Sequence, residues 1–126
     1  MYLIDTNIFL EVLMSQDNSE KCKIFLEENY GNLYMSDFTL HSIGVILFRN
    51  KKFDLFESFA TDVLPNINLL SLKKEKYNIL PETHNICKLD FDDAYQYQIA
   101  REYELTIVTM DNDFKKLKKE INLLFL

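Results

Sequence analysis

The sequence predicts an α/β protein with a central, mainly parallel sheet of four to five strands. Short apolar runs typical of buried strands alternate along the chain with longer segments in which apolar residues recur at helical spacing. Acidic residues directly follow three of these apolar runs, as expected where parallel strands end at a ligand-binding edge. Alternating strands and helices imply a parallel sheet with helices on both faces and right-handed crossovers.

The composition indicates one packed domain over residues 1–126. Hydrophobic residues make up 48% of the chain, with ten Phe and seven Tyr but only two Gly and two Pro, which excludes a disordered or low-complexity protein. The formal net charge of −6 argues against nucleic-acid binding through bulk positive charge, so any such role must be local. Cys22 and Cys87 match no zinc spacing and are expected to be small buried residues in a reducing compartment. No segment approaches the roughly 20 apolar residues that span a bilayer, so we expect a cytoplasmic protein that contacts no membrane.

The predicted strands are short. An apolar run opens the chain, and the β-branched run Thr106–Thr109 is typical of a central strand. The strands are predicted at residues 2–4, 33–35, 66–72, 106–109 and 123–126, the last as an edge strand.

Helical periodicity separates these strands. Residues 5–7 and 36–39 supply signals for the start of a helix, whereas Gly31 and Pro65 each end one. Helices are predicted to carry residues 8–13, 22–30, 43–48, 53–64 and 90–103, with further helix on either side of Pro81 between residues 73 and 89.

Carboxylates at the strand exits are the candidate site. Asp5 follows the first strand, and Asp111 and Asp113 follow the fourth, so parallel pairing brings them to one edge of the sheet. A charge directly after a buried strand is costly to desolvate unless it is paired or binds a cation. The alternative for each is local, since Asp5 and Asp113 could cap a helix and Asp111 could hydrogen-bond its own turn.

Asp93, near the start of the predicted helix 90–103, also has two interpretations. Asp90 with Asp93 three positions later resembles a capping arrangement, and acids at a helix N-terminus are stabilising by about 0.3–1 kcal/mol without a ligand. Converging carboxylates, however, repel one another unless a divalent cation, a proton or a basic residue neutralises them. Hard oxygen ligands suit Mg²⁺ or Mn²⁺, which take the rest of their coordination shell from water and phosphate. The set therefore predicts phosphodiester hydrolysis that leaves a 5′-phosphate and a 3′-hydroxyl.

Three segments carry a resemblance to a known family: LIDTN at residues 3–7, DDA at 92–94 followed by Ala100, and IVTMDNDF at 107–114. In their order and spacing the chain resembles the PIN-domain family, which includes the VapC-like ribonuclease toxins of toxin–antitoxin pairs. The resemblance runs nearly end to end. It implies a three-layer α/β/α sandwich, metal-dependent endoribonuclease activity on RNA with Mg²⁺ or Mn²⁺, a homodimer, and a small antitoxin as partner.

The resemblance also implies roles for individual residues. The catalytic acids would be Asp5, Asp93 and Asp111, which bind the metal together with Asp113. The supporting residues would be Asn7, Thr109 and Asp113, with Asp92 as the alternative to Asp93 if the helix is rotated by one residue.

One position departs from the family pattern. Active members usually carry a Glu in the helix after the second strand, and this chain has Ser42 there. His41 and Asp37 are the candidate replacements, although a lone His beside an apolar helix face is more often a structural residue. The departure leaves open a PIN-like module that binds RNA or a protein partner without cleaving.

Basic residues are the remaining candidates for substrate contact. Lys115 and Lys116 immediately follow the acidic turn and are expected to meet the RNA backbone. The local clusters are Arg49, Lys51 and Lys52; Lys73, Lys74 and Lys76; and Lys115, Lys116, Lys118 and Lys119. A third function, aspartyl phosphotransfer through Asp5, is disfavoured because Asn7 stands where a second, acid–base Asp would be expected.

Overall fold

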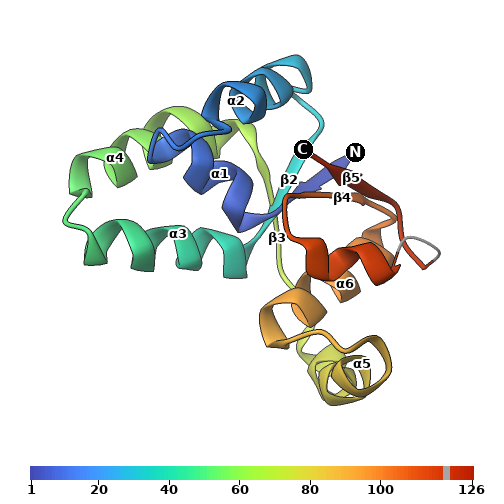
Figure 1. Ribbon diagram of the computed structural model, residues 1–126. Coiled ribbons are helices and arrows are strands. Elements are labelled where there is room, and N and C mark those ends of the chain that lie inside the picture. Colours follow the sequence, from blue (N-terminus) through green and yellow to red (C-terminus); the bar gives the residue numbers. More distant parts are fainter. Residues whose placement is uncertain (118–119) are drawn as a thin grey trace.

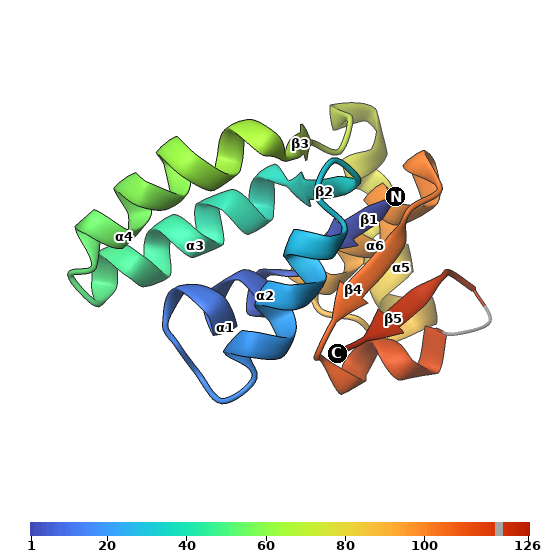
Figure 2. The same cartoon turned by 90° about the horizontal axis from the view of Figure 1, so that it is seen from above.

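The computed structural model describes residues 1–117 and 120–126 and contains a five-stranded sheet in the order β3-β2-β1-β4-β5 (Figures 1 and 2). The strands are β1 Tyr2–Ile4, β2 Leu33–Ser36, β3 Asn68–Leu70, β4 Thr106–Thr109 and β5 Leu123–Phe125. Every pairing is parallel, which confirms the predicted α/β class.

Helices cover both faces of this sheet. They are α1 Thr6–Leu13, α2 Ser19–Glu28, α3 Asp37–Arg49, α4 Phe53–Ser58, α5 Leu80–Cys87 and α6 Phe91–Tyr103. Leu3 pairs with Ile107, and both lie in the apolar cluster that α5 and α6 cover. Their neighbours Ile4 and Val108 point to the opposite face and pack with α1 to α4. The alternation of side chains along each strand thus produces the expected three layers.

Two helices begin immediately where a strand ends, so no long loop follows these strands. Asp5 follows β1 and is the N-cap of α1. Ser36, the last residue of β2, is the N-cap of α3, and its Oγ accepts a hydrogen bond from the backbone N–H of Thr39 at 3.0 Å. The N-cap signals predicted at these positions are therefore confirmed.

Three predicted boundaries differ. The helix predicted over 53–64 is α4 followed by a π-helical turn, Phe59–Val63, and a 3₁₀ turn, Leu64–Asn66. Helix is present on both sides of Pro81 as predicted, as a 3₁₀ helix, Lys74–Ile79, followed directly by α5, but the boundary falls before Leu80. Pro81 lies in the first turn of α5, where a missing N–H breaks no helical hydrogen bond. The strand predicted over 66–72 is limited to β3, because only its central residues pair with β2.

The helical pair α3 and α4 extends beyond the sheet, and the two helices lie side by side in both views (Figures 1 and 2). Phe48 near the end of α3 packs edge-on against Phe53 and Phe56, at ring-centroid distances of 5.0 and 5.6 Å. These aromatic contacts hold α4 against the far end of α3.

The two cysteines differ in their burial. Cys22 is buried as expected, whereas Cys87 is only partly buried, and both are free thiols. Within the part of the chain that the structure describes, no helix combines the length and the apolar character needed to cross a membrane.

Candidate metal centre

Acidic residues from three parts of the chain meet at the carboxyl edge of the sheet. Asp5 lies at the end of β1, and Asp111 lies just beyond the end of its neighbour β4. Asp93 comes from the first turn of α6. Parallel pairing of β1 with β4 brings Asp5 and Asp111 together although more than a hundred residues separate them in the sequence.

Asp5 is both a helix cap and a wall of the site. Its Oδ1 accepts a hydrogen bond from the backbone N–H of Thr6 at 2.8 Å, and its Oδ2 accepts one from the Thr109 hydroxyl at 2.7 Å. The side chain is 8% exposed, and burial raises the pKa of Asp5, an effect that these hydrogen bonds oppose and that Asp111 reinforces. The two sequence interpretations of Asp5 are thus compatible.

Thr109 also shapes the turn that carries the next acids. Its Oγ1 accepts a hydrogen bond from the backbone N–H of Asp111 at 2.9 Å, and Oδ1 of Asp111 accepts one from the backbone N–H of Asp113 at 2.9 Å. Asn7 reaches the same turn from α1, where its Oδ1 accepts from the backbone N–H of Met110 at 3.4 Å. The structure places Asn7 and Thr109 as residues that hold the acidic turn against the end of β1.

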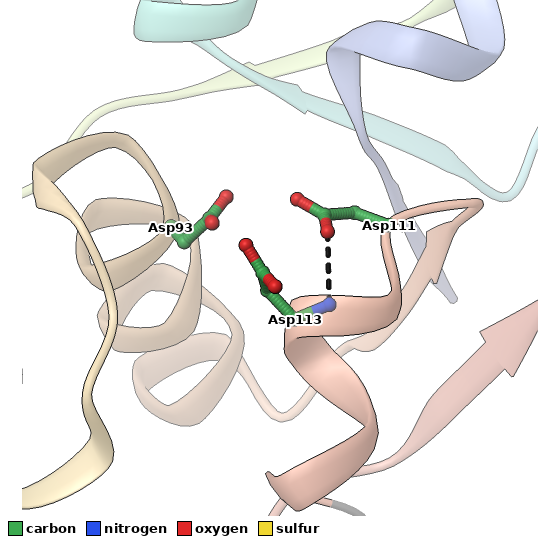
Figure 3. Close-up of side chains that lie close together, drawn as sticks. All are labelled: Asp93, Asp111 and Asp113. Atoms are coloured by element: carbon green, nitrogen blue, oxygen red, sulfur yellow. Dashed lines mark hydrogen bonds between the residues drawn. The ribbon is translucent and has the colours of Figure 1, made fainter.

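Three carboxylates form a tight cluster in front of this turn. Asp93, Asp111 and Asp113 each offer one oxygen, and these oxygens all lie within 4.8 Å of one another (Figure 3). In Figure 3 the Asp93 side chain projects from α6 toward the two acids of the turn. Asp93 is 8% exposed, Asp111 is half-buried and Asp113 is exposed, so the cluster opens to solvent on one side.

The electrostatics of the cluster fit a cation. Burial, followed by repulsion from Asp92, Asp5, Asp111 and Asp113, raises the pKa of Asp93 from 3.8 to about 7. Burial and the neighbouring carboxylates therefore hold this group partly protonated near neutral pH. An all-carboxylate donor set open on one side matches Mg²⁺ or Mn²⁺, which bind a few protein oxygens and keep several waters. The residues present fit such an ion.

The choice between Asp93 and Asp92 is clear from their positions. Asp93 is buried and points into the cluster, whereas Asp92 is exposed and lies at the rim. Asp90 is the N-cap residue of α6, but its side chain makes no capping hydrogen bond. Capping by the pair Asp90 and Asp93 is therefore not what the structure shows.

The acids line a hollow of about 270 Å³, here called the acidic hollow. Its walls include Asp5, Asp93, Asp111, Ser42 and Gln96. Ser42, where the resemblance led us to expect a Glu, thus faces the site but contributes only a hydroxyl.

Neither proposed replacement for the missing Glu joins the acids. His41 is exposed on α3 and lines a neighbouring hollow. The Asp37 carboxylate accepts hydrogen bonds from the Tyr95 hydroxyl at 2.6 Å and from the backbone N–H of Phe38 at 2.9 Å. It is therefore directed at Tyr95.

Gln96 is a site residue that sequence reasoning missed. It is 2% exposed, and its Nε2 donates to the Thr39 hydroxyl at 2.9 Å, while its Oε1 is buried with no hydrogen-bond partner among the described residues. Thr39 in turn is contacted by the hydroxyls of Thr6 and Ser36 at 3.1 and 3.3 Å. The available signal was its position, three residues after Asp93, on the same face of the helix.

The predicted substrate lysines follow the acidic turn in the sequence but do not line the acidic hollow. The Nζ of Lys115 lies 5.7 Å from the centroid of the Phe125 ring, and the Nζ of Lys116 donates to the backbone carbonyl of Lys88 at 2.6 Å. Both side chains are exposed. Lys118 and Lys119, in the same predicted cluster, lie outside the described residues.

The fold and the site together define an α/β protein with a carboxylate centre at the carboxyl edge of a parallel sheet. A family model, "PIN domain", matches residues 2–120. The chain belongs to the PIN-domain family.

Solved structures share this fold. FitAB bound to the DNA fragment IR36 is 24% identical, with a TM-score of 0.78 over 99% of this chain and 94% of that one. VapBC2 from Rickettsia felis, bound to a promoter DNA fragment, is 17% identical with a TM-score of 0.80 over 98% and 97%. VapC20 from Mycobacterium tuberculosis, a toxin that cleaves the sarcin–ricin loop, is 15% identical with a TM-score of 0.79 over 91% and 93%. No curated protein sequence matched.

Proposed function

We propose that this chain is a metal-dependent endoribonuclease acting as the toxin of a toxin–antitoxin pair. The observation that carries the proposal is the cluster of Asp93, Asp111 and Asp113, whose oxygens lie within 4.8 Å of one another while burial and the neighbouring carboxylates raise the pKa of Asp93. Such a cluster is unfavourable for folding alone, and it becomes favourable when a divalent cation binds.

In this proposal Asp93, Asp111 and Asp113 hold Mg²⁺ or Mn²⁺, and Asp5 completes the acidic wall. A bound cation supplies Lewis-acid stabilisation of the charge on the scissile phosphate and lowers the pKa of an attacking water. The Thr109 hydroxyl is hydrogen-bonded both to Asp5 and to the backbone N–H of Asp111, and so it holds these two acids in place. Lys115 and Lys116, which are exposed and follow Asp113 closely in the sequence, contact the RNA backbone outside the acidic hollow.

The proposed partners follow from the family and its relatives. One structural neighbour, from Klebsiella pneumoniae, is a toxin–antitoxin complex. For this chain we propose a small antitoxin as partner, a homodimer as the assembly, and RNA as the substrate, in the cytoplasm. Co-expression with the neighbouring gene and sedimentation of the purified complex test the partner and the number of copies.

One observation favours a second function, RNA or protein binding without cleavage. Ser42 lines the acidic hollow where active family members carry a Glu, so the centre has one carboxylate fewer. A weaker cation site would leave the fold with a binding role only.

Calorimetric titration with Mn²⁺ and Mg²⁺ separates these functions when it is combined with cleavage of a mixed RNA pool. We expect wild-type protein to bind Mn²⁺ and to produce 5′-phosphate ends, whereas Asp93→Asn and Asp111→Asn do neither. Asp17→Asn, at an exposed loop position, is the matched control and should behave as wild type. Mn²⁺ binding without RNA cleavage favours the second function, and absence of both contradicts the nuclease.

A further inference from the structure

A second hollow adjoins the acidic hollow across helix α3. It measures about 540 Å³, and its walls include Phe38, His41, Arg49, Tyr77 and Tyr95. We call it the aromatic hollow. The two hollows share Phe38, Ser42 and Ile46, so they are neighbours along one helix.

Helix geometry explains this shared boundary. Phe38, Ser42 and Ile46 recur every four residues and form one stripe along α3, and the stripe beside it carries His41 and Arg49. The first stripe separates the acidic hollow from the aromatic hollow, and Ser42 stands at its middle. A Glu at this position would extend a long charged side chain over the boundary. Serine has a short side chain, so little side-chain bulk separates the two hollows at position 42.

The aromatic hollow has a rigid apolar wall with one exposed ring. The Tyr95 hydroxyl donates to Asp37 at 2.6 Å and accepts from the backbone N–H of Leu72 at 2.9 Å, which fixes the ring. The ring centroids of Phe38 and Tyr77 lie 5.9 and 5.8 Å from that of Tyr95. Tyr77 is nevertheless 43% exposed. Tyr77, exposed and packed edge-on against the fixed Tyr95 ring, is therefore a platform on which a nucleobase can stack.

The same hollow offers a phosphate ligand. Arg49 is exposed in the last turn of α3 and makes no ion pair within residues 1–117 and 120–126. A guanidinium binds phosphate oxygens through two parallel N–H groups. The one carboxylate in the wall, Asp37, already accepts hydrogen bonds from Tyr95 and from the Phe38 N–H, which directs it away from a bound anion.

We propose that the aromatic hollow binds the nucleotide next to the scissile phosphate of a single-stranded RNA, a proposal that rests on the proposed function. The base stacks on Tyr77, and Arg49 binds the phosphate beyond it. Seven residues of helix separate Ser42 from Arg49, a rise of about 10 Å, which a short RNA segment spans. The strand must be single, because a base inside a duplex cannot reach the ring.

Fluorescence anisotropy of a short labelled single-stranded RNA tests this proposal apart from cleavage. Binding is measured in chelator and, at early times, in Mn²⁺. We expect Tyr77→Ala and Arg49→Gln each to weaken RNA binding about tenfold, the scale of one lost base stack or charged contact. Tyr30→Ala, at another exposed tyrosine, and Arg101→Gln, at the other arginine, are matched controls that should bind as wild type.

An oligonucleotide with abasic sugars provides a second readout. Tyr77→Ala should not weaken its binding further, because the base that stacks on the ring is absent, whereas Arg49→Gln should still do so. Melting temperatures near that of wild type show that the variants fold.

The outcomes distinguish this proposal from the nuclease function. Binding that depends on Tyr77 and Arg49 supports the aromatic hollow even if the wild-type protein does not cut RNA. If both variants bind RNA as wild type while Asp93→Asn abolishes cleavage, the hollow is not a nucleotide site although the nuclease function stands. Absence of RNA binding by wild type in both buffers also overturns the proposal. So does a wild-type dimer that both variants convert to monomer, because that result assigns the surface to a second copy of the chain.

Discussion

The hydroxyl of Thr109 lies 2.7 Å from Oδ2 of Asp5, although 104 residues separate the two in the sequence. The same hydroxyl oxygen accepts from the backbone N–H of Asp111, so one fully buried threonine connects the end of β1 to the acidic turn after β4. Without the Thr109 hydroxyl, Oδ2 of this buried carboxylate would lose a hydrogen bond of 2.7 Å.

Thr109→Val should therefore destabilise the protein more than its similar volume suggests. We expect the free energy of unfolding to fall by about 1–3 kcal/mol, the cost of leaving buried polar groups unpaired. Thr106→Val on the same strand is the control, because Thr106 is half-buried and its side chain makes no such bond, and it should change stability by less than about 0.5 kcal/mol. Urea denaturation measures both, and equal losses would contradict the role of Thr109.

The raised pKa of Asp93 predicts how stability depends on pH without metal. The folded protein holds a proton on Asp93 up to about pH 7, whereas the unfolded chain releases it near 3.8. Between these values the folded state binds more protons, so the free energy of unfolding falls as pH rises and levels off above the folded pKa. Asp5, whose pKa is also raised, contributes in the same direction.

Asp93→Asn should remove this contribution. Its melting temperature relative to wild type should rise from pH 4 and level off above about pH 7 in chelator, and Asp17→Asn should show no such trend. Mn²⁺ should restore wild-type stability most strongly above pH 7, since the cation binds the ionised carboxylates. A constant difference between Asp93→Asn and wild type across this range would contradict the coupled acidic cluster.

The sequence allowed the sheet and most of the acidic edge to be predicted for a simple reason. Strand exits are local features, and parallel pairing then brings Asp5 and Asp111 together without further information. The choice of Asp93 over Asp92 was harder, because it depends on the rotation of α6, which packing against the sheet decides. Contacts that join distant segments, such as Tyr95 with Asp37 across 58 residues, leave no local pattern to read.

Gln96 and the turn Phe59–Val63 show two other limits. A glutamine on an otherwise apolar helix face can be read as solvent-exposed until its burial is known. A π-helical turn keeps nearly the same apolar spacing as an α-helix over so short a length, so the periodicity of residues 53–64 could not reveal it.

Restoring the family's carboxylate at position 42 should strengthen cation binding. Ser42→Glu places a further acid on the wall of the acidic hollow, and we expect Mn²⁺ affinity to rise at least about tenfold through added charge attraction. His41→Glu is the matched control, since it adds the same group one residue away but toward the aromatic hollow. Calorimetry compares the two. A similar gain in both variants would mean that general negative charge, and not position 42, governs binding.

Substitutions of Gln96 test the buried polar residues that lie next to the acids. Gln96→Leu removes the hydrogen bond to Thr39 but also removes the buried Oε1 that has no partner, so the two effects should leave stability within about 1 kcal/mol of wild type.

Gln96→Glu instead adds a buried carboxylate to a hollow that already holds Asp5, Asp93 and Asp111. It should lower the free energy of unfolding by more than about 1 kcal/mol at pH 8 in chelator, and Mn²⁺ should recover much of that loss. Gln98→Glu, where the glutamine bonds Thr83 away from the acids, should show no recovery with Mn²⁺. Equal recovery in both glutamate variants would show that Gln96 does not belong to the metal centre, because a cation held by the acidic cluster has no reason to compensate a charge at position 98.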